Sequence, residues 1–167
     1  MKIPFGPYEP DRSPFAAGSV QYALNCLPRK DGWGPMAMFS EVSEALADEP
    51  RGLLFCRDSA GGLHTFAGTV DNLYKLDTSS FPYTWDEVSK TTDAYALPAG
   101  HRWGAAQWGD YAVFSHTGDV IQKFDLTSDT AFSDLAGSPQ ARFIFPAGDF
   151  LMTAYLSGAK TGCSGLV

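Results

Sequence analysis

Residues able to do acid–base chemistry or to bind a metal are few in this sequence, and their spacing forms no catalytic motif. The only histidines are His64, His101 and His116. With Asp58, Asp110 or Asp119 they could make a metal or acid–base site, but none falls at a ligand spacing such as HxxxH. Ser115 precedes His116 outside any G-x-S-x-G sequence. Because surface or hydrogen-bonded strand histidines explain the pattern more simply, we predict no catalytic residue, no metal site and no cofactor.

Aspartates recur where turns are expected and offer a second possible metal site. They are Asp71, Asp77, Asp119 and Asp125. Their carboxylates could hold calcium, but Asp is also an ordinary turn residue because its side chain accepts hydrogen bonds from the nearby backbone. We interpret these aspartates as turn residues. The glycine-rich pieces 31–34 and 60–62 lack the Lys-Ser/Thr of a phosphate loop and are also predicted to be turns.

Tryptophan is the remaining residue type with a possible binding role. The four are Trp33, Trp85, Trp103 and Trp108. They could stack on sugars, as in a carbohydrate-binding domain. Aromatic residues are also enriched in protein cores and subunit interfaces, and we favour that interpretation.

The composition predicts a folded protein, and the cysteine count and N-terminal residues predict one that is not exported. Of 167 residues, 44% are hydrophobic, 14% aromatic and 19% charged, which suffices for one packed domain. The net charge of -7 argues against nucleic-acid binding, which needs clustered Lys and Arg. Three widely spaced cysteines favour a reducing compartment such as the cytoplasm. The sequence starts without an apolar signal-peptide core, and no run approaches the ~18 apolar residues of a membrane span. We therefore expect no membrane association and no sequence-specific nucleic-acid partner.

The first 50 residues differ from the rest and are predicted to form an extended, Pro-rich arm. Alternating prolines and glycines disfavour long helices and central strands there. Large apolar side chains are nevertheless frequent, and we expect the arm to bury them against its own domain or a neighbouring subunit. The candidate interface residues of the arm are Phe5, Tyr8, Phe15, Tyr22 and Trp33. One short helix is predicted over residues 40–48 (SEVSEALAD), with Ser40 as N-cap and Pro50 beyond its end.

Residues 51–167 are predicted to be entirely β. The stretch 51–77 contains three short antiparallel strands, RGLLFC, LHTFAG and NLYKLD, separated by Gly/Asp-type turns. A similar unit follows at a shift of 48 residues, which aligns residues 72–80 with 120–128 and superposes Phe66 on Phe114. A third unit starts near Arg142, where PAGDFLM echoes QWGDYAV.

Three or four strands per repeat of about 40–50 residues are typical of β-propeller blades. The alternative is a generic meander sandwich with coincidental similarity. The predicted fold is therefore all-β, with antiparallel meanders of partial β-propeller type in residues 51–167, preceded by the arm of residues 1–50. About two and a half units are present, whereas closed propellers need roughly four or more blades. We expect the chain to be part of a longer one or to be completed by other subunits.

Several short motifs follow one another along the chain. The arm contains Asn25-Cys-Leu-Pro-Arg-Lys-Asp-Gly-Trp-Gly-Pro35. The pieces that follow are RGLLF (51–55), TFAGT (65–69), LYKLD (73–77), WDEVS (85–89), HRW (101–103), QWGD (107–110), IQKF (121–124) and FSDL (132–135). In the order and spacing of these motifs, over most of residues 20–155, the sequence resembles tail and head–tail connector proteins of short-tailed bacteriophages.

The resemblance implies a virion structural protein of the tail-hub, nozzle or stabilisation type, without enzymatic activity. Such a protein would assemble as a homo-oligomeric ring around the portal or tail axis, with portal or other tail and connector proteins as partners. It would be made in the host cytoplasm and reside in the virion. In these relatives the propeller continues through further blades. Two alternatives stay open: a carbohydrate- or receptor-binding β-domain of a phage tail and, least favoured, a glycan hydrolase with two acids converging in one cleft.

Overall fold

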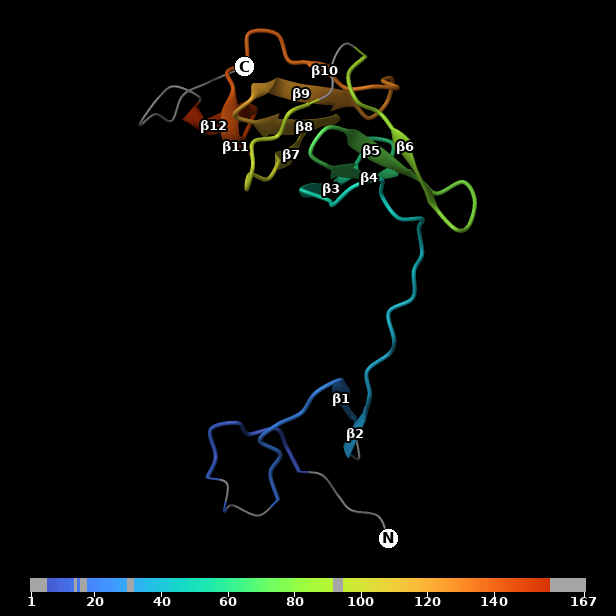
Figure 1. The fold of residues 1–167 in the computed structure, drawn as a ribbon, viewed down its shortest axis with the longest axis vertical. Helices are drawn as coiled ribbons and strands as arrows, with labels where there is room; N and C mark the ends of the chain where they lie inside the picture. Colours follow the sequence, from blue (N-terminus) through green and yellow to red (C-terminus); the bar gives the residue numbers. More distant parts are fainter. Residues whose placement is uncertain (1–5, 14, 16–17, 30–31, 92–94, 157–167) are drawn as a thin grey trace. The chain divides into compact units, whose positions relative to one another are not determined.

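The protein is built from β-strands and turns, with no helix in the residues that the structure describes. The structure is a computed structural model that describes residues 6–13, 15, 18–29, 32–91 and 95–156 (Figure 1). The chain divides into two compact units, Met1–Glu41 and Val42–Val167. All sheets are antiparallel, which confirms the predicted all-β class. Within the described ranges, no helix is long and apolar enough to cross a membrane.

The N-terminal unit contains one hairpin. Its strands are β1 (Cys26–Arg29) and β2 (Gly32–Pro35), with Cys26 opposite Pro35. The backbone N–H of Met36 donates a hydrogen bond to the Asn25 carbonyl (3.0 Å), which extends the ladder by one step. The Asn25–Pro35 sequence is therefore the hairpin itself.

The first large sheet has four strands in chain order. They are β3 (Gly52–Arg57), β4 (Leu63–Gly68), β5 (Leu73–Asp77) and β6 (Thr84–Glu87). The three strands predicted over residues 51–77 are thus confirmed. In the β3–β4 turn, the Asp58 side chain accepts a hydrogen bond from the Gly62 N–H (2.7 Å). Gly61 has a φ of 95°, a conformation open to glycine at little cost.

The second large sheet repeats this plan, and a shorter third sheet follows. The second contains β7 (Gly104–Trp108), β8 (Tyr111–His116), β9 (Asp119–Asp125) and β10 (Ser133–Asp134), and the third contains β11 (Ala141–Ala147) and β12 (Phe150–Leu156). Two-residue Gly-Asp turns join β7 to β8 and β11 to β12. Gly109 and Gly148 have φ values of 58° and 63°, as short hairpin turns require. The predicted echo between QWGDYAV and PAGDFLM is therefore structural.

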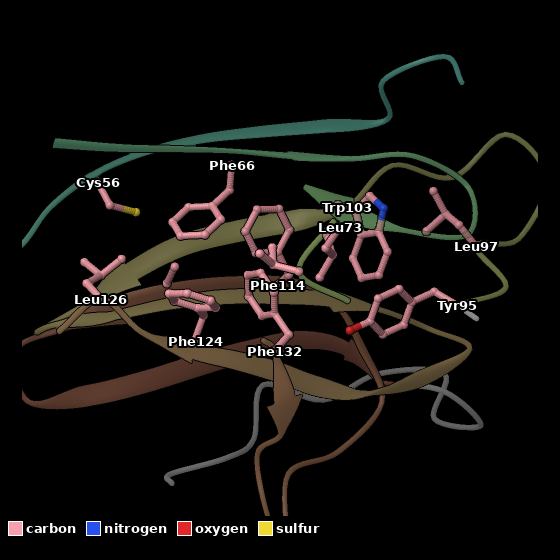
Figure 2. Close-up of a cluster of buried hydrophobic side chains, with 12 residues drawn as sticks. Cys56, Phe66, Leu73, Tyr95, Leu97, Trp103, Phe114, Phe124, Leu126 and Phe132 are labelled. Atoms are coloured by element: carbon pink, nitrogen blue, oxygen red, sulfur yellow. The ribbon is translucent and has the colours of Figure 1, made fainter. Parts of the chain in front are cut away.

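Two cores hold the three sheets together. The first strands of the sheets lie next to one another, β3 beside β7 and β7 beside β11. Between the first two sheets, four buried rings pack with centroids 5.1–6.5 Å apart: Phe66, Phe114, Phe124 and Phe132 (Figure 2). A smaller core joins the second sheet to the third: Ala106, Val113, Ile121, Ile144 and Leu151. Removal of these apolar surfaces from water is the main force that stacks the sheets.

The 48-residue shift aligns β5 with β9 correctly, but it misaligns the preceding strands, β4 and β8, by one residue. Lys75 pairs with Phe66, whereas Lys123 pairs with Val113. The equivalent of Phe66 is therefore Val113, and its predicted match with Phe114 is wrong. The sequence shift missed this because the connection from β4 to β5 is longer than that from β8 to β9, whose ladder also has a register irregularity. A one-residue slip turns a side chain to the other face, so Phe114 points back towards Phe66.

The predicted helix over residues 40–48 is wrong. Its backbone groups instead form hydrogen bonds with the residue just before β6. The Glu44 N–H donates to the Tyr83 carbonyl (2.8 Å), and the Tyr83 N–H donates to the Val42 carbonyl (3.0 Å). A nine-residue helix is marginal in water without packing on one face, so a strand-like bridge to the sheet outcompetes it. The segment from Val42 onward belongs to the same unit as the sheets, whereas the arm was predicted to extend to residue 50.

Candidate functional site

The predicted interface residues of the arm lie in the N-terminal unit, apart from Phe5, which is outside the described residues. Tyr8 and Trp33 contact each other edge to face, with ring centroids 6.3 Å apart. The indole N–H of Trp33 also donates a hydrogen bond to a backbone carbonyl of the same unit (3.0 Å). Phe15 and Tyr22, by contrast, are 96% and 78% exposed. Tyr8 and Trp33 thus contact each other within the unit, with Tyr8 still 51% exposed, and Phe15 and Tyr22 are accessible to another molecule.

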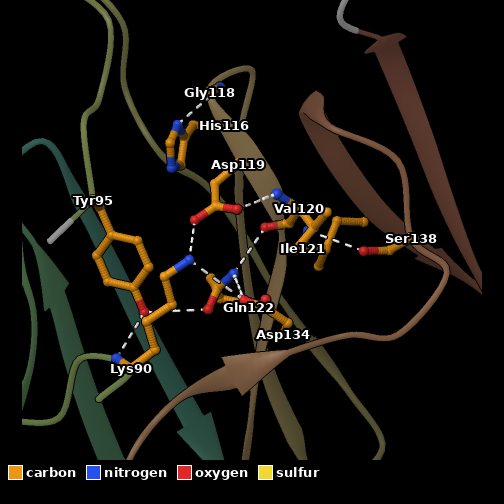
Figure 3. Close-up of polar contacts among 10 residues, drawn as sticks. All are labelled: Lys90, Tyr95, His116, Gly118, Asp119, Val120, Ile121, Gln122, Asp134 and Ser138. Atoms are coloured by element: carbon orange, nitrogen blue, oxygen red, sulfur yellow. Dashed lines mark hydrogen bonds and ion pairs between the residues drawn. The ribbon is translucent and has the colours of Figure 1, made fainter. Parts of the chain in front are cut away.

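A cluster of charged residues ties the linker between the large sheets to the second sheet (Figure 3). Lys90 forms an ion pair with Asp119 in β9, and its amine lies 3.5 Å from the Asp134 carboxylate in β10. Burial by itself would lower the pKa of Lys90, but the two carboxylates outweigh burial and the pKa is raised. Lys90 therefore stays charged and holds its partners in place.

Tyr95 and Gln122 continue this cluster into the core. The Tyr95 hydroxyl accepts a hydrogen bond from the Lys90 backbone N–H (3.1 Å) and donates one to the Gln122 side-chain oxygen (3.3 Å). The Gln122 amide in turn donates to Asp134 (2.7 Å). Burial raises the pKa of Tyr95 far above its usual range, so the phenol stays protonated. Buried polar groups bonded to one another in this way make a structural connection between elements.

His116 is a buried histidine beside this cluster. It is 1% exposed, and its Nδ1 accepts a hydrogen bond from the Gly118 N–H (3.1 Å). Its ring packs edge to face on Trp103 with centroids 4.5 Å apart. Burial lowers the pKa of His116, an effect that the Asp119 carboxylate opposes and that Lys90 reinforces. The folded protein therefore holds a neutral imidazole between aromatic rings.

The buried His116 should make the protein less stable in mild acid. Its folded-state pKa lies below the unfolded value of about 6.5. As the pH falls below about 6.5, the unfolded chain takes up a proton that the folded chain resists, so the free energy of unfolding decreases. We expect a slope of up to about 1.4 kcal/mol per pH unit from this one group, measured by urea unfolding between pH 7.5 and 5. His116→Gln should flatten the slope, and an unchanged slope would contradict this role.

The other histidines contact polar groups in turns. His64 and Asp58 share a hydrogen bond (2.9 Å) that, together with the Gly62 N–H, lowers the pKa of Asp58. His101 contacts the Thr117 hydroxyl at 3.4 Å. Among the described residues, no group of three or more His, Cys, Asp or Glu could hold a metal ion. These residues are positioned to close the β3–β4 and β8–β9 turns.

Two of the repeated aspartates make the same turn in successive sheets. Asp77 accepts hydrogen bonds from the backbone N–H and hydroxyl of Ser79, each at 2.8 Å. Asp125 does the same with Thr127, at 2.9 and 2.7 Å. The bonds lower the pKa of both carboxyl groups. Turn formation thus accounts for the recurrence of these two aspartates.

The structure separates two of the tryptophans considered for sugar binding. Trp103 is 6% exposed and lies in the first core, so it cannot present its face to a ligand. Trp108 lies near the surface beside Tyr111, with ring centroids 6.1 Å apart. These rings line a hollow of about 320 Å³ together with the two Gly-Asp turns, whose acidic residues are Asp110 and Asp149.

The outermost sheets each leave an apolar face exposed. On the first sheet, Leu54 and Cys56 point into the core, so the alternate residues point outward. We call this outward surface the first outer face, which carries Leu53, Phe55 and Leu63 at 66%, 62% and 62% exposure. On the third sheet, Ile144 and Leu151 point inward. We call its outward surface the last outer face, which carries Phe143, Phe145 and Phe150.

Sequence reasoning missed the Lys90 cluster and the two outer faces. Lys90 is far in sequence from Asp119 and Asp134, and only the order of strands β9 and β10 brings the carboxylates together. The outer faces had a usable signal, since Leu53-Leu54-Phe55 and Phe143-Ile144-Phe145 are apolar on both sides of a strand. Such a pattern is typical of a strand covered on both faces.

No protein-family model matches this sequence, and no curated protein matches it significantly.

Proposed function

We propose that this protein is a structural assembly subunit, of the class of virion proteins found in phage tails and head–tail connectors. The observation that supports it best is the pair of exposed apolar faces at the two ends of the sheet stack. Large apolar patches on a folded domain mark sites of association. The sequence resemblance to tail and connector proteins supplies the class of assembly.

A partial β-propeller describes the sheet stack best within this proposal. Successive four-stranded meanders with adjacent first strands are the arrangement of propeller blades, and the third sheet supplies half a blade. Its partners would be further copies of the chain and portal or other tail and connector proteins. The N-terminal unit, with Phe15 and Tyr22 exposed, would dock on those neighbours. The protein would then serve as a structural part of the virion and would catalyse no reaction.

Mass and symmetry in solution test the structural role. We expect light scattering to give a mass above that of the 18.0 kDa monomer, and electron microscopy to show closed rings. A mass that stays monomeric at high protein concentration would count against the proposal.

The hollow beside Trp108 supports a second candidate, a carbohydrate- or receptor-binding domain of a phage tail. The aromatic rings can stack on a sugar, and the neighbouring carboxylates can accept hydrogen bonds from its hydroxyl groups. A glycan array would test it: binding should be lost in Trp108→Ala and retained in Trp85→Ala. An array without any binding would remove this candidate and leave the assembly role untouched.

A further inference from the structure

We infer that copies of this chain bind head to tail, with the last outer face of one copy packed on the first outer face of the next. This inference rests on the proposed structural role and assigns the surfaces that carry it. The reasons are the equivalence of these faces to contacts already made inside the chain, and their shapes.

The last outer face is the counterpart of a surface that already binds a sheet. The hairpins β7–β8 and β11–β12 have the same register about their Gly-Asp turns, 39 residues apart. This places Phe145 at the position of Ala106 and Phe150 at that of Tyr111. Ala106 belongs to the core through which the second sheet packs on the third, and Tyr111 packs against it. Phe145 and Phe150 therefore occupy the positions from which a following sheet would be bound.

The first outer face is the counterpart of the opposite surface. Leu54 pairs with Phe66 as Ala106 pairs with Val113, so Leu53 matches Ala105 and Phe55 matches Gln107. Ala105 packs into the core shared with the preceding sheet. Gln107 hydrogen-bonds the backbone of that preceding sheet, its amide donating to the Arg57 carbonyl (2.6 Å).

The two exposed faces are thus the two halves of one kind of contact. Inside the chain this contact occurs twice. Each time, one sheet packs on the next sheet in the chain through the face that points towards the C-terminal sheet, and the next sheet contributes its opposite face. A second copy supplies the missing half at each end. Such a head-to-tail interface uses two different patches on each copy and produces rings when the rotation closes.

Each face also has a feature that favours such a contact, a hollow on one and half-exposed rings on the other. The first outer face adjoins a hollow of about 510 Å³ lined in part by Leu46, Leu53 and Trp85. The last outer face presents the half-exposed rings of Phe143 and Phe145 on neighbouring outward positions of β11. Aromatic side chains that fill an apolar hollow are the usual anchors of protein interfaces.

The test uses one charged substitution on each face of the full chain. Leu53→Glu blocks the first outer face, Phe145→Glu blocks the last, and Phe81→Glu is the control in the exposed β5–β6 loop. Each face variant alone should raise the concentration of half-assembly by about 100-fold or more, because an unpaired carboxylate would be buried. Phe81→Glu should assemble as the unmodified chain does. Circular dichroism and thermal unfolding establish folding, and Phe55→Glu or Phe143→Glu replaces a variant that fails to fold.

A mixture of the two face variants distinguishes head-to-tail from symmetric contacts. Each variant keeps one intact face, so the equimolar mixture should form a dimer, detected by light scattering, although neither forms one alone. Assembly of either variant alone, or a mixture that stays monomeric, would overturn the inference while the structural role stands. An unmodified chain that is monomeric would overturn both.

Discussion

Replacement of Phe114 by alanine should lower the free energy of unfolding by about 3–5 kcal/mol, because it empties the centre of the first core. Phe114 is fully buried and contacts the rings of Phe66, Trp103 and Phe132, with centroids 5.4–6.5 Å apart. Phe66 comes from the first sheet, Trp103 from the segment between the two large sheets, and Phe132 from the connection between β9 and β10. No single neighbour can move to fill the void without loosening the others. Urea unfolding followed by tryptophan fluorescence and circular dichroism measures the change.

Phe81→Ala is the matched control for this substitution. Phe81 is 73% exposed in the loop between β5 and β6, so its removal should change stability by no more than about 0.5 kcal/mol. Equal costs for the two substitutions would show that the first core is not the packing centre of the stacked sheets.

Trp103→Ala should cost a similar amount, about 3–5 kcal/mol, for a different reason. The indole lies over two paired glycines, Gly52 in β3 and Gly68 in β4. A Cβ on Gly68 would lie 2.6 Å from the indole nitrogen, so only glycine leaves room for the ring. The indole N–H donates a hydrogen bond to the Thr69 carbonyl (2.7 Å), which anchors the ring at the end of β4. Trp108→Ala, at the periphery of the second core, is the control and should cost clearly less.

The reciprocal substitution separates this close packing from a general loss of core volume. Gly68→Ala should destabilise the protein by about 1–3 kcal/mol, because the indole must shift. In the Trp103→Ala background the same glycine substitution should cost much less, since the clashing ring is gone. Additive costs in this double-mutant cycle would mean that the glycine and the indole do not share a contact.

Local sequence signals predicted where the strands and turns lie. Short apolar runs, such as those in β3 and β8, and the Gly-Asp pairs at 109–110 and 148–149 are signals that act over a few neighbouring residues. A turn needs only its own backbone angles and side-chain bonds, as the Asp77 and Asp125 turns show. These features are therefore readable without any knowledge of distant contacts.

Other features depended on which segments meet in space. Residues 40–48 have the local sequence features of a helix, but this segment forms backbone hydrogen bonds with Tyr83 instead. The match of Phe66 with Phe114 failed because two hairpin connections differ in length. No local pattern could indicate either outcome, because both depend on pairing between residues that are distant or shifted in register.

The sequence by itself determined that this chain is all-β, built from repeated antiparallel units, with no recognisable catalytic motif. Only the tertiary structure decided which side chains share a core, which charges pair around Lys90, and which apolar faces stay uncovered. The physical reason is the range of the interactions: backbone angles and turn bonds are set by adjacent residues, whereas sheet stacking joins distant residues, such as Arg57 and Gln107 or Phe66 and Phe132. Leu53 and Phe145 are as apolar as the buried residues beside them, and only the order of the stacked sheets leaves them exposed.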